Sequence, residues 1–262
     1  MPSLLGFDLE ALFETQDRAA AENYQRSEFF RKAFTFQSDC LRLCLNFNGV
    51  ERFANAEKAT AVRMFTVDCL SHVIVGIRLA MWGAVPQSLA ILRGAVEASA
   101  LLAHVVFGQR YQTAIHEVNK KFGEIEFKNT LRQLGSLGDD IEYYWGRISE
   151  YAHASAKRIR QASYEHDGLE YDRVGGAIDP DGAATAMYFS IHPTLLVLVC
   201  MREAARQEPE GFPWEEEFEQ LASRSTKLGE EFKRQVQVEE MATAPAEIKV
   251  TPEIAAEHGV TH

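Results

Sequence analysis

The sequence predicts an all-α protein whose residues 1–238 fold as a single helical bundle. Apolar residues recur at intervals of three and four over long stretches, which is the period of an amphipathic helix. Alternating runs of Val, Ile and Thr bounded by turn residues are scarce, so few strands are expected. With 262 residues, 46% of them hydrophobic, the chain is long enough to bury a substantial core.

Three long helical regions are predicted in the N-terminal half of the chain. The first spans Leu9 to Phe47, either as one helix or as two with a break between them. A second helix is expected from Ala56 to Gly83, and a third from Gln87 to Phe107, where Pro86 suits the first turn. The third is apolar around most of its circumference, which is typical of a buried helix. Charged residues interrupt this apolar region, so we expect core helices and no membrane span.

Glycines and acidic residues divide the next part of the chain. A fourth helical region is expected from about Arg110 to Leu134, with a possible break at Gly123, and Gly135 and Gly138 then bracket a turn. Asp139 or Asp140 would cap a fifth helix, which continues to about residue 159.

Residues 163–182 are rich in Gly, Asp and Tyr and have no helical period, which predicts a long irregular loop, with a short hairpin as an alternative. Such a loop is either a lid or a solvated insertion. A sixth helix should span Ala183 to Arg206, kinked or broken at Pro193. An acidic helix from Trp214 to Val238 and a flexible tail over residues 239–262 complete the chain.

The charge distribution limits the classes of partner. The net charge is −11, which opposes coating of DNA or RNA by the whole molecule. Residues 207–262 hold 13 acidic and 5 basic residues, whereas residues 1–206 hold 25 and 22. Because the excess acidity is C-terminal, the body of the protein can still carry a local basic site.

The four cysteines predict neither a metal site nor a disulfide framework. Cys40, Cys44, Cys69 and Cys200 include no CxxC pair and have no nearby histidine at metal-ligand spacing. Cys40 and Cys44 would share one helix face, so a soft metal is the alternative to ordinary packing. We expect reduced, buried thiols, no cofactor and a cytoplasmic location, in agreement with an N-terminus that does not resemble a signal peptide.

Arg93 and Glu97 are the formal charges in the apolar third helix. They lie four residues apart and therefore on one helix face, and an unpaired charge there would be costly. We predict that they pair. They either bind a polar ligand or orient a catalytic group, or they tie this helix to its neighbours.

Residues 143–155 form a second polar cluster, in which aromatic and polar side chains alternate. From Arg147 to Arg160 there are four basic residues and one acid, so this window would attract RNA or another anionic ligand. The alternative is that its aromatic residues belong to the core or to an interface and that His153 forms a hydrogen bond within the bundle.

The same window resembles the HEPN superfamily of helical domains, which includes metal-independent ribonucleases of toxin and phage-defence systems. Arg147 and His153 fit its R-x4-6-H signature. The stretches 91–98 (ILRGAVEA) and 148–153 (ISEYAH) are similar to the LLR-x3-E-A and LSEYVH elements of a related family of bacterial helical proteins. The resemblance covers about residues 60–205. Catalytic members commonly have a polar residue after the arginine, where this chain has Ile148.

The resemblance implies a homodimer with Arg147 and His153 near its symmetry axis. His153 would transfer a proton, and Arg147 would stabilise the charge that develops on the phosphorane. The supporting polar residues would be Arg93, Glu97, Glu150, Tyr151 and Ser155. The alternative to a ribonuclease is a non-catalytic interaction or scaffold protein in which the same residues are structural, so the sequence leaves open whether the chain is an enzyme.

Overall fold

The computed structural model describes residues 9–47, 53–108, 111, 124–152, 163–166, 169–172 and 178–243, and it confirms the all-α bundle. A short antiparallel hairpin of two strands accompanies the helices. The elements are α1 (Leu9–Arg26), α2 (Glu28–Asn46), α4 (Ala56–Met81), α5 (Val85–Phe107), α7 (Glu124–Gln133), α8 (Ser136–Ala152), β1 (Ser163–His166), β2 (Leu169–Asp172), α10 (Pro180–Arg206) and α11 (Glu215–Thr243).

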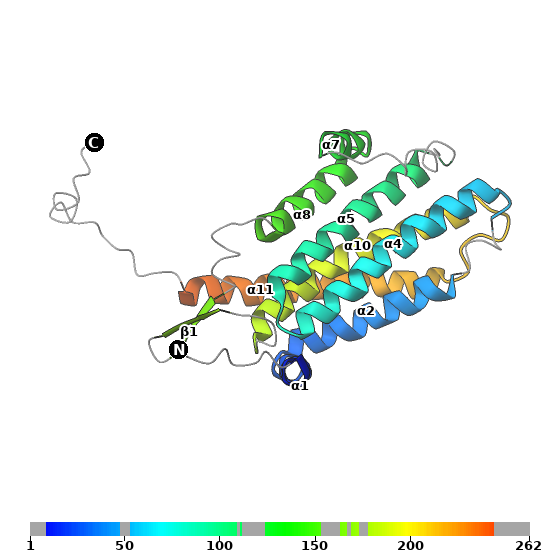
Figure 1. Ribbon diagram of the computed structural model, residues 1–262. Coiled ribbons are helices and arrows are strands. Elements are labelled where there is room, and N and C mark those ends of the chain that lie inside the picture. Colours follow the sequence, from blue (N-terminus) through cyan, green and yellow to red (C-terminus); the bar gives the residue numbers. More distant parts are fainter. Residues whose placement is uncertain are drawn as a thin grey trace, which may run out of the picture.

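Helix α5 lies at the centre of the bundle and packs against α4, α8 and α10 (Figure 1). Helix α10 also contacts α2 and α4, and α11 packs against α2. The shorter helices α1 and α7 lie crosswise to the long ones (Figure 1). The core is continuous through these layers, and Leu89, Leu92 and Leu102 of α5 are fully buried within it.

The first helical region is two helices, one of the two predicted arrangements. The break falls at Ser27, whose backbone is extended and whose side chain accepts a hydrogen bond from the Phe30 amide. This N-cap satisfies an amide that has no partner within the helix. Asn55 caps α4 in the same way, by accepting from the Lys58 amide at 2.9 Å.

The predicted start of the fifth helix was wrong. Helix α8 begins at Ser136, so Asp139 and Asp140 lie inside it and do not cap it. Gly135 alone makes the turn, with a φ of 59° that favours glycine. Gly138 has a different role: a Cβ atom there would lie 1.9 Å from the Leu131 carbonyl oxygen, so glycine allows α7 and α8 to approach closely.

Within the predicted loop over residues 163–182, the described residues form the short hairpin that the sequence allowed and, at the other end, the first residues of α10. Strands β1 and β2 pair from Ser163 with Asp172 to His166 with Leu169, which is the hairpin alternative. Helix α10 begins at Pro180, where Asp179 is the N-cap and accepts from the Gly182 amide at 3.0 Å.

Two further helix predictions need correction. Helix α10 is a single helix that includes Pro193, so the predicted break is absent. Its packing against α2, α4 and α5 stabilises the helix despite the missing amide donor. Helix α11 continues to Thr243, beyond the predicted end at Val238, and the rest of the predicted tail lies outside the described residues.

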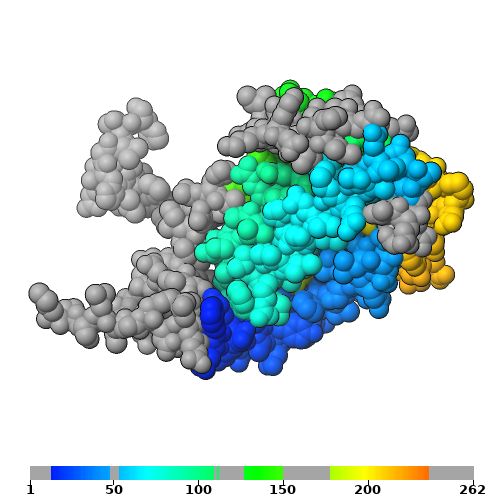
Figure 2. All heavy atoms as spheres, turned by 45° about the vertical axis from the view of Figure 1, so that its right-hand side comes forward, coloured from blue at the N-terminus to red at the C-terminus, as the bar shows by residue number. Residues whose placement is uncertain are grey.

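Among the helices that the structure describes, α4, α5 and α10 are long and apolar enough to span a membrane by length and composition. In α5 and α10, 61% and 72% of the most apolar window is buried inside the bundle. In α4 the buried share is 44%, because one face of this helix lies at the surface. Figure 2 shows α4 and α5, in cyan and teal, on one side of the molecule beside α1 and α2 in blue.

Candidate functional site

The predicted Arg93–Glu97 pair is present and includes a third residue. Arg93 Nε donates to Glu97 Oε1 at 3.0 Å, and Trp145 Nε1 of α8 donates to the same oxygen at 2.8 Å. The Arg93 guanidinium lies over the Trp145 ring, 4.6 Å from its centroid. We call these three residues the α5–α8 cluster.

The α5–α8 cluster is only partly accessible to solvent. The Arg93 and Glu97 side chains are 24% and 39% exposed, and Trp145 is buried against Phe127 of α7, with ring centroids 5.5 Å apart. Because Glu97 accepts both a charged and a neutral donor at one oxygen, the cluster fixes the position of α8 on α5. The charged pair therefore lies at the partly exposed edge of the contact between α5 and α8, and Trp145 fills its buried part.

Arg147, the predicted catalytic arginine, lies on the same helix as Trp145 but on another face. It is two residues further along α8, which places it about 200° around the helix axis from Trp145. The Arg147 side chain is half-buried, whereas Ile148 and Ser149 next to it are buried. The helix geometry therefore directs Arg147 away from the α5 face that carries Arg93 and Glu97.

The other predicted site residues are not described in the structure. His153 and Ser155 lie outside the described residues. Glu150 and Tyr151 belong to the last turn of α8, but the placement of their side chains is not described.

A second polar and aromatic cluster lies between α8 and α10. This cluster was not predicted from the sequence. The rings of Tyr144 and His192 are stacked at 4.0 Å with an angle of 20°, and the Tyr144 and Tyr188 hydroxyls are 3.2 Å apart. His192 Nδ1 is buried and has no hydrogen-bond partner among the described residues. Burial lowers the pKa of His192 to about 4, so its imidazole is neutral near pH 7.

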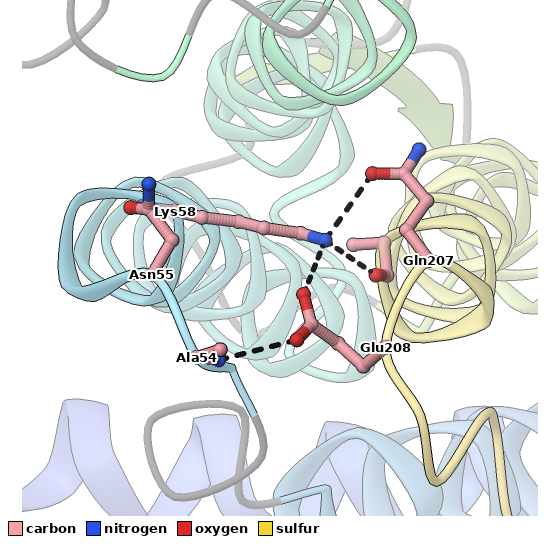
Figure 3. Close-up of polar contacts among 6 residues, drawn as sticks. Ala54, Asn55, Lys58, Gln207 and Glu208 are labelled. Carbon is pink, nitrogen blue, oxygen red and sulfur yellow. Dashed lines mark hydrogen bonds and ion pairs between the residues drawn. The ribbon is translucent and has the colours of Figure 1, made fainter.

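The structure also contains a buried lysine that was not predicted from the sequence. Lys58 of α4 is 5% exposed, and its ammonium group donates to three acceptors at the C-terminal end of α10 (Figure 3). These are the Ala204 carbonyl at 2.8 Å, Gln207 Oε1 at 3.2 Å and Glu208 Oε1 at 2.7 Å. Glu208 Oε2 accepts in turn from the Ala54 amide at 3.2 Å.

The contacts of Lys58 account for all three ammonium protons. Its hydrogen bond to Glu208 holds the pKa of that carboxyl below its usual range. The lysine also lies 5.0 Å from the centroid of the Phe53 ring. An ammonium that is fully bonded and charged is not a nucleophile, so we assign Lys58 to stability and not to chemistry.

The four thiols are free and buried, as predicted. Burial raises the pKa of Cys40 to about 12 and raises the pKa values of Cys44, Cys69 and Cys200 above their usual range. Such thiols are protonated and inert. Within the part of the chain that the structure describes, no group of three or more His, Cys, Asp or Glu side chains is arranged to hold a metal ion.

Comparison of the chain with protein-family models, with curated proteins and with solved structures gave no match. The residues of the structure are therefore the basis for any functional conclusion.

Lys58 could have been singled out by its position in the sequence. Lys58 falls on the same face of α4 as Val62, Phe65 and Cys69, all of which are buried. A charged residue on a predicted core face indicates a buried partner, although the sequence does not say where that partner is. Trp145 belongs to the aromatic residues for which a core or interface position was the alternative prediction, but its hydrogen bond to Glu97 depends on how α8 packs on α5.

Proposed function

We propose that this chain is a non-catalytic helical interaction protein of the cytoplasm, in which Arg93 and Glu97 have a structural role. One observation supports this most directly: Glu97 Oε1 is occupied by donors from its own helix and from α8. A carboxylate engaged in this way holds two helices together and has less capacity to bind a ligand. The four unpaired thiols support the cytoplasmic location.

The second candidate is a metal-independent ribonuclease related to HEPN domains, with Arg147 and His153 as catalytic residues. One observation favours it: the helix geometry directs Arg147 away from the α5–α8 cluster, so that cluster does not account for Arg147. In this alternative, the basic window that begins at Arg147 would bind RNA and His153 would transfer the proton.

An RNA-cleavage assay distinguishes the two candidates. Purified protein is incubated with a mixture of RNAs in EDTA, beside the His153→Ala and Arg147→Ala variants. The interaction role predicts that the wild type leaves the RNA intact. Cleavage by the wild type that either substitution abolishes would establish the ribonuclease, while cleavage that persists in both variants would indicate a contaminating nuclease and leave the interaction role standing.

A further inference from the structure

Helix α8 lies on the outer side of the bundle, where it packs mainly on α5 and α7 and makes only a small contact with α10 (Figure 1). Aromatic rings dominate this small contact. Tyr144 of α8 stacks on His192 of α10, with ring centroids 4.0 Å apart. The same ring lies 6.4 Å from Tyr188 and 6.2 Å from Phe189, both of α10. The contact of α8 with α10 therefore depends largely on Tyr144 and the rings beneath it.

His192 lies at the centre of this contact without a polar partner for its Nδ1 atom. That atom is buried and accepts no hydrogen bond from the described residues. A neutral imidazole fits this position, because one of its two ring nitrogens carries no proton. The imidazolium form would place an N–H on each nitrogen, and the buried Nδ1–H would then have no acceptor. A buried charge without a bonded partner is strongly unfavourable.

The groups of α8 and α10 next to the imidazole offer it no counter-charge. On α8 the titratable neighbours are Tyr144 and, one turn earlier, Asp140, which acts on the Tyr144 hydroxyl. On α10 the titratable neighbour is Tyr188, whose hydroxyl lies 3.2 Å from that of Tyr144. Burial is the cause that lowers the pKa of His192, and no charged group of the described residues contributes to it.

The other helices around α10 and α8 leave this environment uncharged. The charged residues of α5 that contact α8, Arg93 and Glu97, meet Trp145 on the adjoining face of that helix. The remaining helices contact neighbouring positions of α10 with uncharged groups: Phe232 of α11 with Tyr188, Gln37 of α2 with Ser190, and the Cys69 thiol of α4 with the Pro193 carbonyl.

We propose that the Tyr144–His192 contact is a pH-sensitive switch, in which protonation of His192 releases α8 from α10 while the rest of the bundle stays folded. The release is local because α10 packs extensively on α2, α4 and α5, whereas its contact with α8 is small. Released, α8 uncovers the rings of Tyr144, Tyr188 and Phe189, which gives the protein an aromatic surface in acid. This switch goes beyond the proposed interaction role and does not depend on it.

The direction of the switch follows from the two protonation states. Burial lowers the pKa of His192 to about 4 while α8 is docked, and exposure returns it to about 6.5 when α8 is released. The docked arrangement is therefore fully favoured above pH 6.5 and becomes less favoured as the pH falls towards 4. Between pH 7.5 and pH 5, this linkage raises the equilibrium constant for release about 30-fold.

Cysteine labelling measures the release. Ile148 lies one turn after Tyr144 and is fully buried, so Ile148→Cys provides a thiol that reacts only when α8 moves. The four native thiols are buried in α2, α4 and α10, so they report opening of the rest of the bundle. A pyridyl disulfide that reacts with thiols in mild acid labels the protein, and peptide mass spectrometry identifies the labelled positions.

Each labelling rate is divided by the rate of the same thiol in the unfolded protein at the same pH. From pH 7.5 to pH 5, the relative rate at position 148 should rise about 30-fold while the native thiols stay protected. Adding His192→Asn should remove this rise, because asparagine does not titrate and every carboxylate, including Glu97, is still present. His72→Asn is the matched control on α4 and should leave the rise in place.

Three outcomes would overturn the proposal: equal relative rates at position 148 at both pH values, a rise that persists in His192→Asn, or labelling of the native thiols together with the introduced one. The last would show that the whole bundle opens. Ile141→Cys, at another fully buried position of α8, repeats the test if circular dichroism shows that Ile148→Cys does not fold. The RNA assay is independent of these results, so failure of the switch would leave the proposed function standing.

Discussion

Lys58 Nζ of α4 lies 2.7 Å from Glu208 Oε1 at the end of α10, and both side chains are almost completely buried, at 6% and 10% exposure. This ion pair joins the N-terminal end of one core helix to the C-terminal end of another. Because 150 residues separate the two partners, the contact depends on the correct packing of the whole bundle.

We expect Lys58→Met to destabilise the protein by about 3 kcal/mol, because it leaves the Glu208 carboxylate buried without its cation. Urea unfolding followed by circular dichroism measures this loss. Lys227→Met, at an exposed lysine of α11, is the matched control and should change stability by less than about 0.5 kcal/mol. Adding Glu208→Leu to Lys58→Met should recover part of the loss, since no charge then remains unpaired. Equal stability of the two single variants would contradict this account.

His192 should make the protein sensitive to mild acid. Its pKa in the folded protein is about 4, below the ordinary value of 6.5, so the imidazole must lose its proton to be buried. Its contribution to stability is therefore constant above pH 6.5 and decreases as the pH falls from 6.5 towards 4, by up to about 3 kcal/mol. Urea unfolding at a series of pH values measures this slope.

His192→Asn should remove most of that slope between pH 6.5 and 4.5, because asparagine does not titrate. His72→Asn is the control. His72 is partly exposed beside Asp68 on α4, and its loss should leave the slope in place. If the slope survives in His192→Asn, another group is responsible for it.

The four thiols should react only when the protein opens. In the native state a thiol reagent such as DTNB should modify none of them over minutes, because each is buried and protonated. In concentrated guanidinium chloride all four should react at once. Rapid modification of a thiol in the native protein would show that the helices around it open locally.

The sequence predicts features that depend on neighbours along the chain. The Arg93–Glu97 pair was predictable because the two charges lie four residues apart in an apolar helix. Pro86 in the first turn of α5 and the burial of the cysteines were predictable for similar local reasons. The start of α8 was not predictable, because a φ of 59° at Gly135 allows the chain to turn four residues earlier than a cap at Asp139 would require.

Contacts between residues that lie far apart in the chain could not be predicted from the sequence. Lys58 and Glu208 meet only because α4 and α10 run side by side, and the apolar pattern of each helix does not specify its neighbour. The same holds for His192, whose burial results from the stacking of Tyr144 of α8 against α10. The continuity of α10 through Pro193 is also a tertiary effect, because packing on three neighbours outweighs the lost hydrogen bond.

The central claim is that Glu97 and Trp145 hold α5 and α8 together, and a double-mutant cycle tests it most directly. Glu97→Leu, which removes the acceptor, Trp145→Phe, which removes the donor, and the double variant are compared by urea unfolding. Trp82→Phe is the control, because Trp82 Nε1 is buried but has no hydrogen-bond partner among the described residues. We predict a coupling energy of about 1 kcal/mol between Glu97 and Trp145 and none between Glu97 and Trp82. Strictly additive effects of Glu97→Leu and Trp145→Phe would contradict the structural role of the α5–α8 cluster.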